Sequence, residues 1–558
     1  MSSEYNIKQT LLNFVKENKT VVLTYLFFTM AFPLGEVVLP HYYGKIVDKI
    51  SSNPSDLYGA IQGDLKMVVI LWLAIQAFGT VSNRLDSYMI PKLQSYVRQN
   101  LVVNVLNSFK ENYHDLDVGA LISRVIKLPF VISDVAYLVK SYIVPTVWIL
   151  LVASSYFFYI DAGLGLVSLF GMSMFVYTIY NFTNSCMFTS NDMDENSNDL
   201  HNEVGDVFKN LMNIYAANTV EQEVKRFEQY QETLDQKYTD TIKCSSTFKK
   251  WFSLSYLTLF VLINGYSLWL YSHKKVGLQE VTSTLIVSLY LVNHLKGLGS
   301  EIRDYVYDIG VLSSTQNYLN GLSKVVIKNG NEQLNVNKGN VSFSNIGMKY
   351  GNNVLFKNIN LDIPAGQRLA LVGKIGSGKT SLVQLLMKLK PHTGKIYVDG
   401  KELDRCCCNS VRQQITYVPQ LPTLFQRSIY ENIIYGSNNI SKQDVKNLIR
   451  KLDLDGVFGE HSLDTVVGKD GAQLSGGQQR TIFLLRCLLR DNKILILDEP
   501  TTSLDKHSKI HIMNILKELM KGKTVIMITH DEELLQYVDR VVTMHKGEII
   551  DDNSSKGK

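Results

Sequence analysis

The stretch from Gly373 to Thr380 constrains the fold of this chain more than any other part of the sequence. Its letters, GKIGSGKT, fit the pattern G-x-x-x-x-G-K-S/T, whose glycines let backbone N–H groups close on phosphate oxygens at the positive end of a following helix. A short apolar strand, Leu369–Val372, precedes the loop, and residues 380–389 have helical spacing. The pattern therefore predicts a strand, a phosphate-binding loop and a helix that together hold a nucleoside triphosphate.

Two later apolar runs are each followed by polar side chains of catalytic type. The run Ile494–Leu497 leads directly into Asp498 and Glu499, as expected of a buried parallel strand that delivers two carboxylates at its end. Asp498 suits a contact to Mg²⁺, as does the hydroxyl of Thr380. The second run, Val525–Ile528, comes shortly before His530.

A further motif, LSGGQ, begins at Leu474, about a hundred residues after the phosphate loop. Together the two motifs make residues 341–552 resemble the nucleotide-binding domain of the ATP-binding cassette (ABC) transporter family. The whole chain is similar to a half-size exporter of the B-type (type IV), in which one transmembrane domain precedes one such cassette. The resemblance implies that LSGGQ is the ABC signature, which contacts the ATP of a partner chain through Leu474, Ser475, Gly476, Gly477 and Gln478.

The resemblance also assigns the catalytic residues. Glu499 would be the general base that polarises the attacking water, His530 the switch histidine at the γ-phosphate, and Gln420 the Q-loop glutamine that senses the nucleotide. Lys379 completes the catalytic set as a point charge on the β/γ-phosphates. The D-loop is Ser503, Leu504 and Asp505, and the expected Mg²⁺ ligands are Thr380, Gln420 and Asp498. The nucleotide-binding set, in which Tyr350 stacks on adenine, is Tyr350, Gly373, Lys374, Ile375, Gly376, Ser377, Gly378, Lys379, Thr380 and Ser381.

Long apolar runs in the first 320 residues predict membrane spans. Three of them, Tyr142–Ile160, Leu164–Tyr180 and Leu254–Leu270, approach the ~20 residues that cross a bilayer and are almost free of charge. Three further segments complete the six helices of the family's membrane domain, and the last of these is too short on hydropathy alone and is included because of the resemblance. The expected spans are roughly 20–44, 66–90, 137–160, 162–184, 250–272 and 279–302.

The expected fold is therefore multidomain, with an all-α, six-helix transmembrane domain followed by an α/β P-loop ABC ATPase domain. The boundaries are 1–322 for the transmembrane domain, 323–340 for a linker, 341–552 for the nucleotide-binding domain and 553–558 for a tail. Basic residues concentrate between the second and third spans and between the fourth and fifth. This bias predicts that those long loops, both termini and the nucleotide-binding domain are cytosolic.

All six cysteines fall on the predicted cytosolic side, so disulfides are not expected. They are Cys186, Cys244, Cys406, Cys407, Cys408 and Cys487. Three of them are consecutive, but adjacent side chains diverge and no partner Cys or His cluster is evident, which argues against a metal site. The role of these three thiols stays open.

Together these features predict an integral, multi-pass membrane protein that uses ATP and Mg²⁺ to drive export and that pairs with a second half-transporter. A homodimer is the expected form, because every catalytic position holds a competent residue type, and a heterodimer is the alternative. An ATP-gated channel or regulator and an exporter-fold importer are further alternatives, although Glu499 favours sustained turnover. The apolar spans oppose a soluble ABC ATPase, and a net charge of +5 without a nucleic-acid motif gives no reason to expect DNA or RNA as a partner.

The sequence does not name the transported compound, the membrane or, with certainty, the direction of transport. Glu36, Lys140 and Lys296 are ionisable residues in or beside predicted spans. Two explanations fit them equally: they line a cavity, or they lie at helix ends with their charges at the interface.

Overall fold

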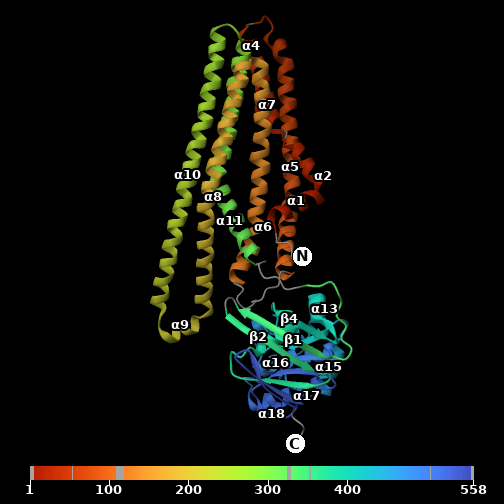
Figure 1. Ribbon diagram of the computed structural model, residues 1–558. Helices are drawn as coiled ribbons and strands as arrows, with labels where there is room; N and C mark the ends of the chain where they lie inside the picture. The colour runs from red at the N-terminus through yellow and green to blue at the C-terminus, as the bar shows by residue number, and fades with distance from the viewer. Residues whose placement is uncertain are drawn as a thin grey trace. The chain divides into compact units, whose positions relative to one another are not determined.

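The computed structural model describes residues 6–29, 31–52, 54–107, 118–322, 329–350, 353–502 and 504–554. The chain divides into two compact units, Met1–Lys324 and Val325–Lys558. The first unit is built from helices, and the second combines strands with shorter helices (Figure 1). Part of the expected linker, residues 323–328, and part of the expected tail, residues 555–558, lie outside the described residues.

Four very long helices dominate the first unit. The elements are α1 (Ile7–Glu17), α2 (Lys19–Phe28), α3 (Ala31–Pro33), η1 (Leu34–Val38), α4 (Leu39–Ser51), α5 (Leu57–Asn107), α6 (Val118–Leu138), η3 (Val139–Ile143), α7 (Val144–Ile160), α8 (Ala162–Lys209), α9 (Leu211–Ala217), α10 (Val220–Ser272) and α11 (Leu278–Leu322). Helices α5, α8, α10 and α11 have 51, 48, 53 and 45 residues. At 1.5 Å per residue they are roughly 70 to 80 Å long, so each must extend well beyond a hydrocarbon core of ~30 Å.

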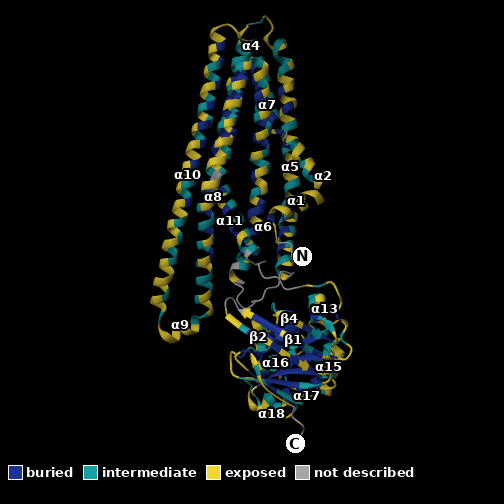
Figure 2. Cartoon of the chain, in the orientation of Figure 1, coloured by how far each residue is buried: buried dark blue, intermediate teal, exposed yellow. Residues whose placement is uncertain are grey.

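Five described helical stretches are long and apolar enough to cross a membrane. They are Lys19–Ser51, Leu57–Leu106, Leu121–Ile160, Ala162–Lys209 and Val220–Ser272. Many residues on the outer sides of these helices are exposed (Figure 2). Helix α11, which contains the sixth expected span, is not among these five stretches. It nevertheless packs along α10, α8 and α4 as part of the bundle.

Two of the expected spans contain a π-helical turn shortly before a proline. In η1 the Leu39 N–H donates to Leu34 O, five residues back, and Pro40 follows. In η3 the Val144 N–H donates to Val139 O, and Pro145 follows. Because proline has no N–H to continue the regular helical ladder, the helix changes its hydrogen-bond register at these points.

A disulfide joins α8 and α10, which corrects the expectation that the cysteines are unpaired. Cys186 and Cys244 are bonded, with their Cα atoms 5.6 Å apart. The two cysteines are 58 residues apart and lie opposite each other because α8 and α10 run side by side. Cys186 is fully buried in a core to which η1, α7 and α11 also contribute. The prediction relied on the redox state of the compartment and could not account for a pair enclosed between two helices. Cys406, Cys407, Cys408 and Cys487 are free thiols.

The second unit contains two sheets. Its strands are β1 (Val341–Tyr350), β2 (Asn353–Ile363), β3 (Arg368–Val372), β4 (Thr393–Val398), β5 (Lys401–Glu402), β6 (Ile415–Val418), β7 (Ile494–Asp498), β8 (Thr524–Ile528), β9 (Arg540–His545) and β10 (Glu548–Ser554). The smaller sheet has the order β2-β1-β4-β5 and is antiparallel. The larger has the order β10-β9-β3-β8-β7-β6, in which every neighbouring pair is parallel except β10 and β9.

Helices pack around the larger sheet and complete the α/β unit. They are α12 (Lys379–Leu386), α13 (Cys408–Gln414), α14 (Ile429–Ile433), α15 (Lys442–Lys451), α16 (Gly476–Arg490), α17 (Lys506–Met520) and α18 (Glu532–Leu535), with short 3₁₀ turns η4 (Leu403–Arg405) and η5 (Lys469–Gly471). Every residue of the central strands β7 and β8 is buried. Since parallel strands end at one edge of a sheet, the residues that follow β3, β6, β7 and β8 are brought together there.

Candidate nucleotide-binding site

The phosphate loop connects β3 to α12 and has a backbone that only glycine adopts without strain at two key positions. Gly373 has φ +143°, and an added Cβ would lie 2.1 Å from Met544 O. Gly378 has φ +98°, and its Cβ would lie 2.4 Å from the Phe356 ring. The two glycines therefore permit both the turn and the close packing of the loop on its neighbours. Ile375, at the tip of the loop, is 97% exposed.

The Lys379 side chain curls back over this loop. Its Nζ donates hydrogen bonds to Gly373 O at 2.6 Å and to Lys374 O at 3.2 Å. The residue is buried, and this burial lowers the pKa of Lys379, while the nearby carboxylates of Glu499 and Asp498 act in the opposite direction. The ammonium group is thus held at the centre of the loop, where the phosphates of a nucleotide bind in loops of this type.

Two of the three expected Mg²⁺ ligands meet. Thr380 Oγ1 donates to Asp498 Oδ1 at 3.3 Å, and the Tyr417 hydroxyl donates to Asp498 Oδ2 at 3.1 Å. Asp498 is 2% exposed, and burial raises its pKa. A hydroxyl beside a carboxylate fits the oxygen preference of Mg²⁺. The third expected ligand, Gln420, makes its hydrogen bond to Glu499 instead.

Glu499, Gln420 and His530 converge from the ends of β7, β6 and β8. Gln420 Nε2 donates to Glu499 Oε2 at 2.7 Å, and His530 Nε2 lies 3.8 Å from Glu499 Oε1. The Thr502 hydroxyl also donates to Glu499 Oε2, at 3.0 Å. Glu499 itself has φ +46°, an unusual conformation for a residue with a side chain and one that is often retained at functional sites. Its N–H donates to Ile528 O at 2.8 Å, which ties the turn to β8.

Arg480 is a functional candidate that the sequence did not single out. It lies on α16 and is 5% exposed. Its guanidinium donates to the backbone carbonyls of Glu499, at 3.0 Å, and of Gln420, at 2.6 Å. Arg480 thereby fixes the backbone of both residues. One signal in the sequence could have identified Arg480: it is an arginine on the inward face of the helix that begins with the signature.

The signature residues form the start of α16. Ser475 Oγ accepts a hydrogen bond from Gln478 N at 3.3 Å, and Gln478 Oε1 accepts one from Ser475 N at 2.9 Å, so the two residues form a capping box. Gln478 Nε2 donates to Val457 O at 3.0 Å. Ser475 and Gly476 are exposed, whereas Leu474 and Gly477 are buried. These hydrogen bonds hold the start of α16 in place, and its polar end lies at the surface.

The residues expected to form the D-loop and to stack on adenine lie only partly within the described part of the structure. Asp505 caps α17, because its Oδ1 accepts hydrogen bonds from the N–H groups of His507 and Ser508, both at 2.9 Å. Leu504 is half-buried beside it, and Ser503 lies outside the described residues. The Tyr350 backbone pairs with Asn353 in the β1–β2 sheet, and its side chain lies outside the described part of the structure.

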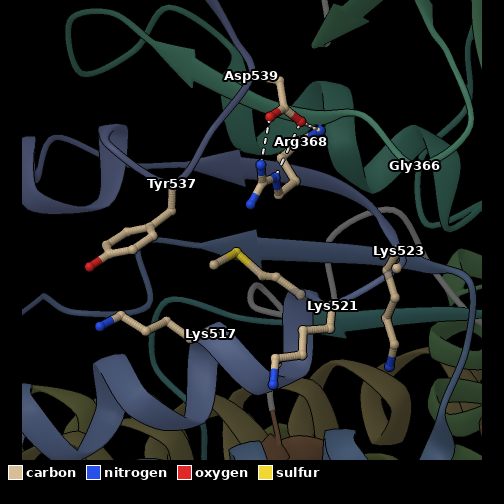
Figure 3. A pocket seen from close by; sticks show the side chains of 9 residues that line it. Gly366, Arg368, Lys517, Lys521, Lys523, Tyr537 and Asp539 are labelled. Carbon is tan, nitrogen blue, oxygen red and sulfur yellow. Dashed lines mark hydrogen bonds and ion pairs between the residues drawn. The ribbon is translucent and has the colours of Figure 1, made fainter. Parts of the chain in front are cut away.

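A separate cavity of about 430 Å³ lies in the same unit (Figure 3). Its lining includes Arg368 and Lys523, at or just before the starts of β3 and β8. Asp539, just before β9, accepts hydrogen bonds from the Arg368 guanidinium at 2.6 and 3.2 Å. These are the amino ends of the parallel strands, and the catalytic candidates follow the carboxyl ends. The cavity is therefore distinct from the candidate nucleotide site.

Two family profiles match the chain. Residues 22–295 match the family described as ABC transporter transmembrane region, and residues 356–502 match the one described as ABC transporter. The chain therefore belongs to the ABC transporters and is a multi-pass membrane protein with an ABC ATPase domain. Within that family, it has the domain order of an exporter half-transporter, with one transmembrane region fused to one nucleotide-binding domain.

Named relatives and a solved structure agree with this assignment. ABC transporter B family member 14 of Arabidopsis thaliana is 34% identical over 225 residues, which are 39% of this chain and 18% of the plant protein. An ATP-dependent lipid A-core flippase of Pectobacterium atrosepticum is 37% identical over 229 residues, 40% of this chain and 39% of the flippase. A Rickettsia typhi protein named as an export ATP-binding/permease protein is 25% identical over 97% of this chain and 94% of its own length.

The solved structure is that of a bacterial Atm1-family ABC exporter with ATP bound. It has a TM-score of 0.85 and 19% identity, and the match covers 97% of this chain and 95% of that one. This similarity shows that the two proteins share a fold. The chain spans less than half of the plant and flippase relatives that it matches, whereas the match to the Rickettsia protein is nearly full-length.

Proposed function

We propose that the protein is an ATP-driven exporter that works as a dimer of two such chains. The observation that supports this most strongly is the convergence of Glu499, Gln420 and His530 beside the phosphate loop, in a chain that also carries the family's transmembrane region. Binding of ATP would close two nucleotide-binding domains on each other and open the membrane path to the far side. Hydrolysis would then reset the transporter.

Each residue of the site has a separate role in ATP hydrolysis. Lys379 and the loop N–H groups bind the phosphates, and Glu499 accepts a proton as the water oxygen attacks the γ-phosphorus and the bond to the β–γ bridging oxygen breaks. His530 steadies the γ-phosphate. Mg²⁺, held by Thr380, Asp498 and Gln420, would neutralise phosphate charge. The Gln420 amide can serve both partners, because its N–H group holds Glu499 while its oxygen stays available to a metal.

A partner chain is required because the signature is separate from the phosphate loop. Among the described residues, the side-chain hydrogen bonds of Ser475 and Gln478 go to each other and to Val457, and those of Lys379 go to its own loop. The exposed start of α16 is therefore available to ATP bound by a second chain. We propose a homodimer, since this chain supplies both halves of a competent site, and a heterodimer is the alternative outcome.

Tyr350 gives a test of nucleotide recognition. Because stacking needs an aromatic ring but no hydroxyl, Tyr350→Phe should bind ATP nearly as the wild type does. Tyr350→Ala should bind ATP more weakly by about 1 to 3 kcal/mol, on the scale of base–aromatic stacking. Isothermal titration with a non-hydrolysed ATP analogue measures both. Equal affinities of the two variants would show that the ring does not stack on adenine.

Topology can be tested with two introduced cysteines at opposite ends of α10. Lys274 is exposed in the connection between α10 and α11, and Asn213 is exposed on α9 at the other end. Because α10 is much longer than the bilayer is thick, these ends should lie on opposite sides of the membrane. In sealed vesicles, an impermeant maleimide on the side away from the nucleotide-binding domain should label Lys274→Cys and spare Asn213→Cys. Labelling of both from that side would reject the proposed topology. The native Cys186 and Cys244 cannot react with the maleimide, because their sulfur atoms are bonded to each other.

ATPase activity in reconstituted protein tests the exporter proposal against a channel. A panel of lipids, peptides, amphiphiles and metal–thiol conjugates should contain at least one compound that raises the rate of ATP hydrolysis. ATP-dependent ion conductance, without stimulation of hydrolysis by any compound, would favour an ATP-gated channel.

A further inference from the structure

An apolar cavity of about 310 Å³ lies inside the helical unit. It is enclosed by side chains of α1, α2, α5, α6, η3, α7 and α11, among them the buried Phe14, Leu93 and Ile132. Lys140 is the only charged side chain among the described residues that line it. Such mostly apolar walls offer ordered water few of the several polar partners that it needs, and they favour a hydrocarbon.

The mouth of this cavity opens onto the outside of the helical unit. Five of its lining residues are exposed: Ala136, and Val15 by 43%, Leu26 by 37%, Tyr137 by 50% and Val139 by 39%. Leu26, Tyr137 and Val139 belong to stretches that are apolar and long enough to cross a membrane. The bilayer is therefore the natural source of an occupant, because its hydrocarbon chains lie against this surface.

A half-buried ion pair forms the polar end of the cavity. Lys140 Nζ lies 2.5 Å from Asp86 Oδ2, and the Tyr25 hydroxyl also donates to the Asp86 carboxylate. The side chains of Lys140 and Asp86 are 11% and 18% exposed. Lys140 lines the cavity and Asp86 does not, so Lys140 is the charged residue of the lining that an occupant can contact. Charges buried at membrane depth are costly and are usually retained for function.

The π-helical turn η3 lies at the same place. Lys140 is its second residue, and both Val139 and Lys140 line the cavity. Turns of this kind inside helices occur frequently at functional sites. The turn, the ion pair and the cavity are three separate observations that coincide at one position.

We propose that this cavity binds an anionic lipid of the bilayer. One alkyl chain fills the apolar space between α1, α5 and α6, and an acceptor oxygen of the phosphate head group takes a hydrogen bond from the Lys140 ammonium. An ammonium carries three N–H donors, so it can serve Asp86 and a phosphate together. A cationic head group gains no such hydrogen bond, because Lys140 has only donors and the Asp86 carboxylate is already paired with Lys140 and Tyr25. This site is independent of the identity of the transported compound.

The test uses spin-labelled lipids in phosphatidylcholine nanodiscs that contain the full-length protein. The measured quantity is the fraction of the label that the protein immobilises, compared between phosphatidic acid and a lipid with the same chains and a quaternary ammonium head. The wild type should favour phosphatidic acid by about tenfold, the effect of one charge-assisted hydrogen bond. Equal immobilisation of the two probes would overturn the proposal.

Two variants separate the head group from the chain. The double variant Asp86→Asn with Lys140→Met removes both charges without leaving either unpaired, and it should abolish the preference between the probes. Leu93→Trp fills the cavity and should release both probes. Leu166→Trp, at a position on α8 that is 62% exposed, is the control that should change neither, and basal ATPase activity should be retained in all of these proteins. A preference that survives both the double variant and Leu93→Trp would place the lipid elsewhere.

A second copy of this chain is the other occupant that the mouth could accept. If two chains cover each other there, Leu26→Cys should form a disulfide-linked dimer under oxidising conditions. The lipid site predicts that this variant stays monomeric on a non-reducing gel, and a high yield of crosslinked dimer would contradict it.

Discussion

Replacing Glu499 with Gln should lower ATP turnover by ~10²-fold or more while ATP binding is retained. The amide keeps the shape of the side chain and can still pair with Gln420 and Thr502, whose donors now reach the carboxylate at 2.7 and 3.0 Å. It cannot accept the proton of the attacking water. ATP should therefore hold the two nucleotide-binding domains closed. Phosphate release and retention of labelled ATP by the purified protein measure the two effects.

Glu460→Gln is a suitable control for this substitution. Glu460 is an exposed glutamate in a loop of the same unit, and it does not follow any of the strands whose ends carry the catalytic candidates. Its replacement should leave turnover unchanged. Near-normal hydrolysis by Glu499→Gln protein would reject Glu499 as the base and would turn attention to His530, which lies 3.8 Å away.

Mixing two inactive chains should restore one working site. Chains with Lys379→Ala lack the phosphate-loop cation, and chains with Ser475→Arg have a blocked signature. In the proposed dimer, each ATP site combines the phosphate loop of one chain with the signature of the other. In a mixed dimer, one site therefore contains both substitutions, and the other pairs an intact loop with an intact signature. Co-purified mixed dimers should occlude about one nucleotide each, whereas dimers of either variant alone should occlude almost none.

Mixed dimers that occlude no nucleotide would contradict this arrangement. If the signature acted on the loop of its own chain, or if the chain paired only with a different subunit, mixing would restore nothing. Each variant carries a different affinity tag, so that only mixed dimers survive two purification steps. Binding of the chains to each other is then established before occlusion is measured.

The residues of the candidate site could be picked out from short local patterns, and their roles were expected from the resemblance to the family. The apolar strand before Asp498 and Glu499 and the one before His530 are parallel neighbours in the large sheet, so their ends had to meet. The residues that the prediction missed make contacts over long distances in the sequence. Arg480 holds the carbonyl of Gln420 across 60 positions, and Tyr417 reaches Asp498 across 81. No local pattern encodes such pairs.

In the helical unit, the sequence did not predict how the long helices pack against each other. Hydropathy locates long apolar helices, but it does not specify their register against each other. The Cys186–Cys244 disulfide depends on how α8 lies along α10, so a prediction based on the expected cytosolic location of the thiols was wrong. Each π-helical turn precedes a proline, Pro40 or Pro145, but Pro91 and Pro129 lie inside α5 and α6, so a proline alone does not predict such a turn.

Uphill transport into sealed proteoliposomes tests the central claim most directly. Vesicles with the nucleotide-binding domain outside are given Mg-ATP and a compound that stimulates hydrolysis, and the internal concentration of the compound is followed. The account predicts that the wild type accumulates the compound above its external concentration and that Glu499→Gln protein does not. Equilibration to equal concentrations on both sides, at the same rate in both proteins, would contradict an ATP-driven exporter and would identify a passive channel.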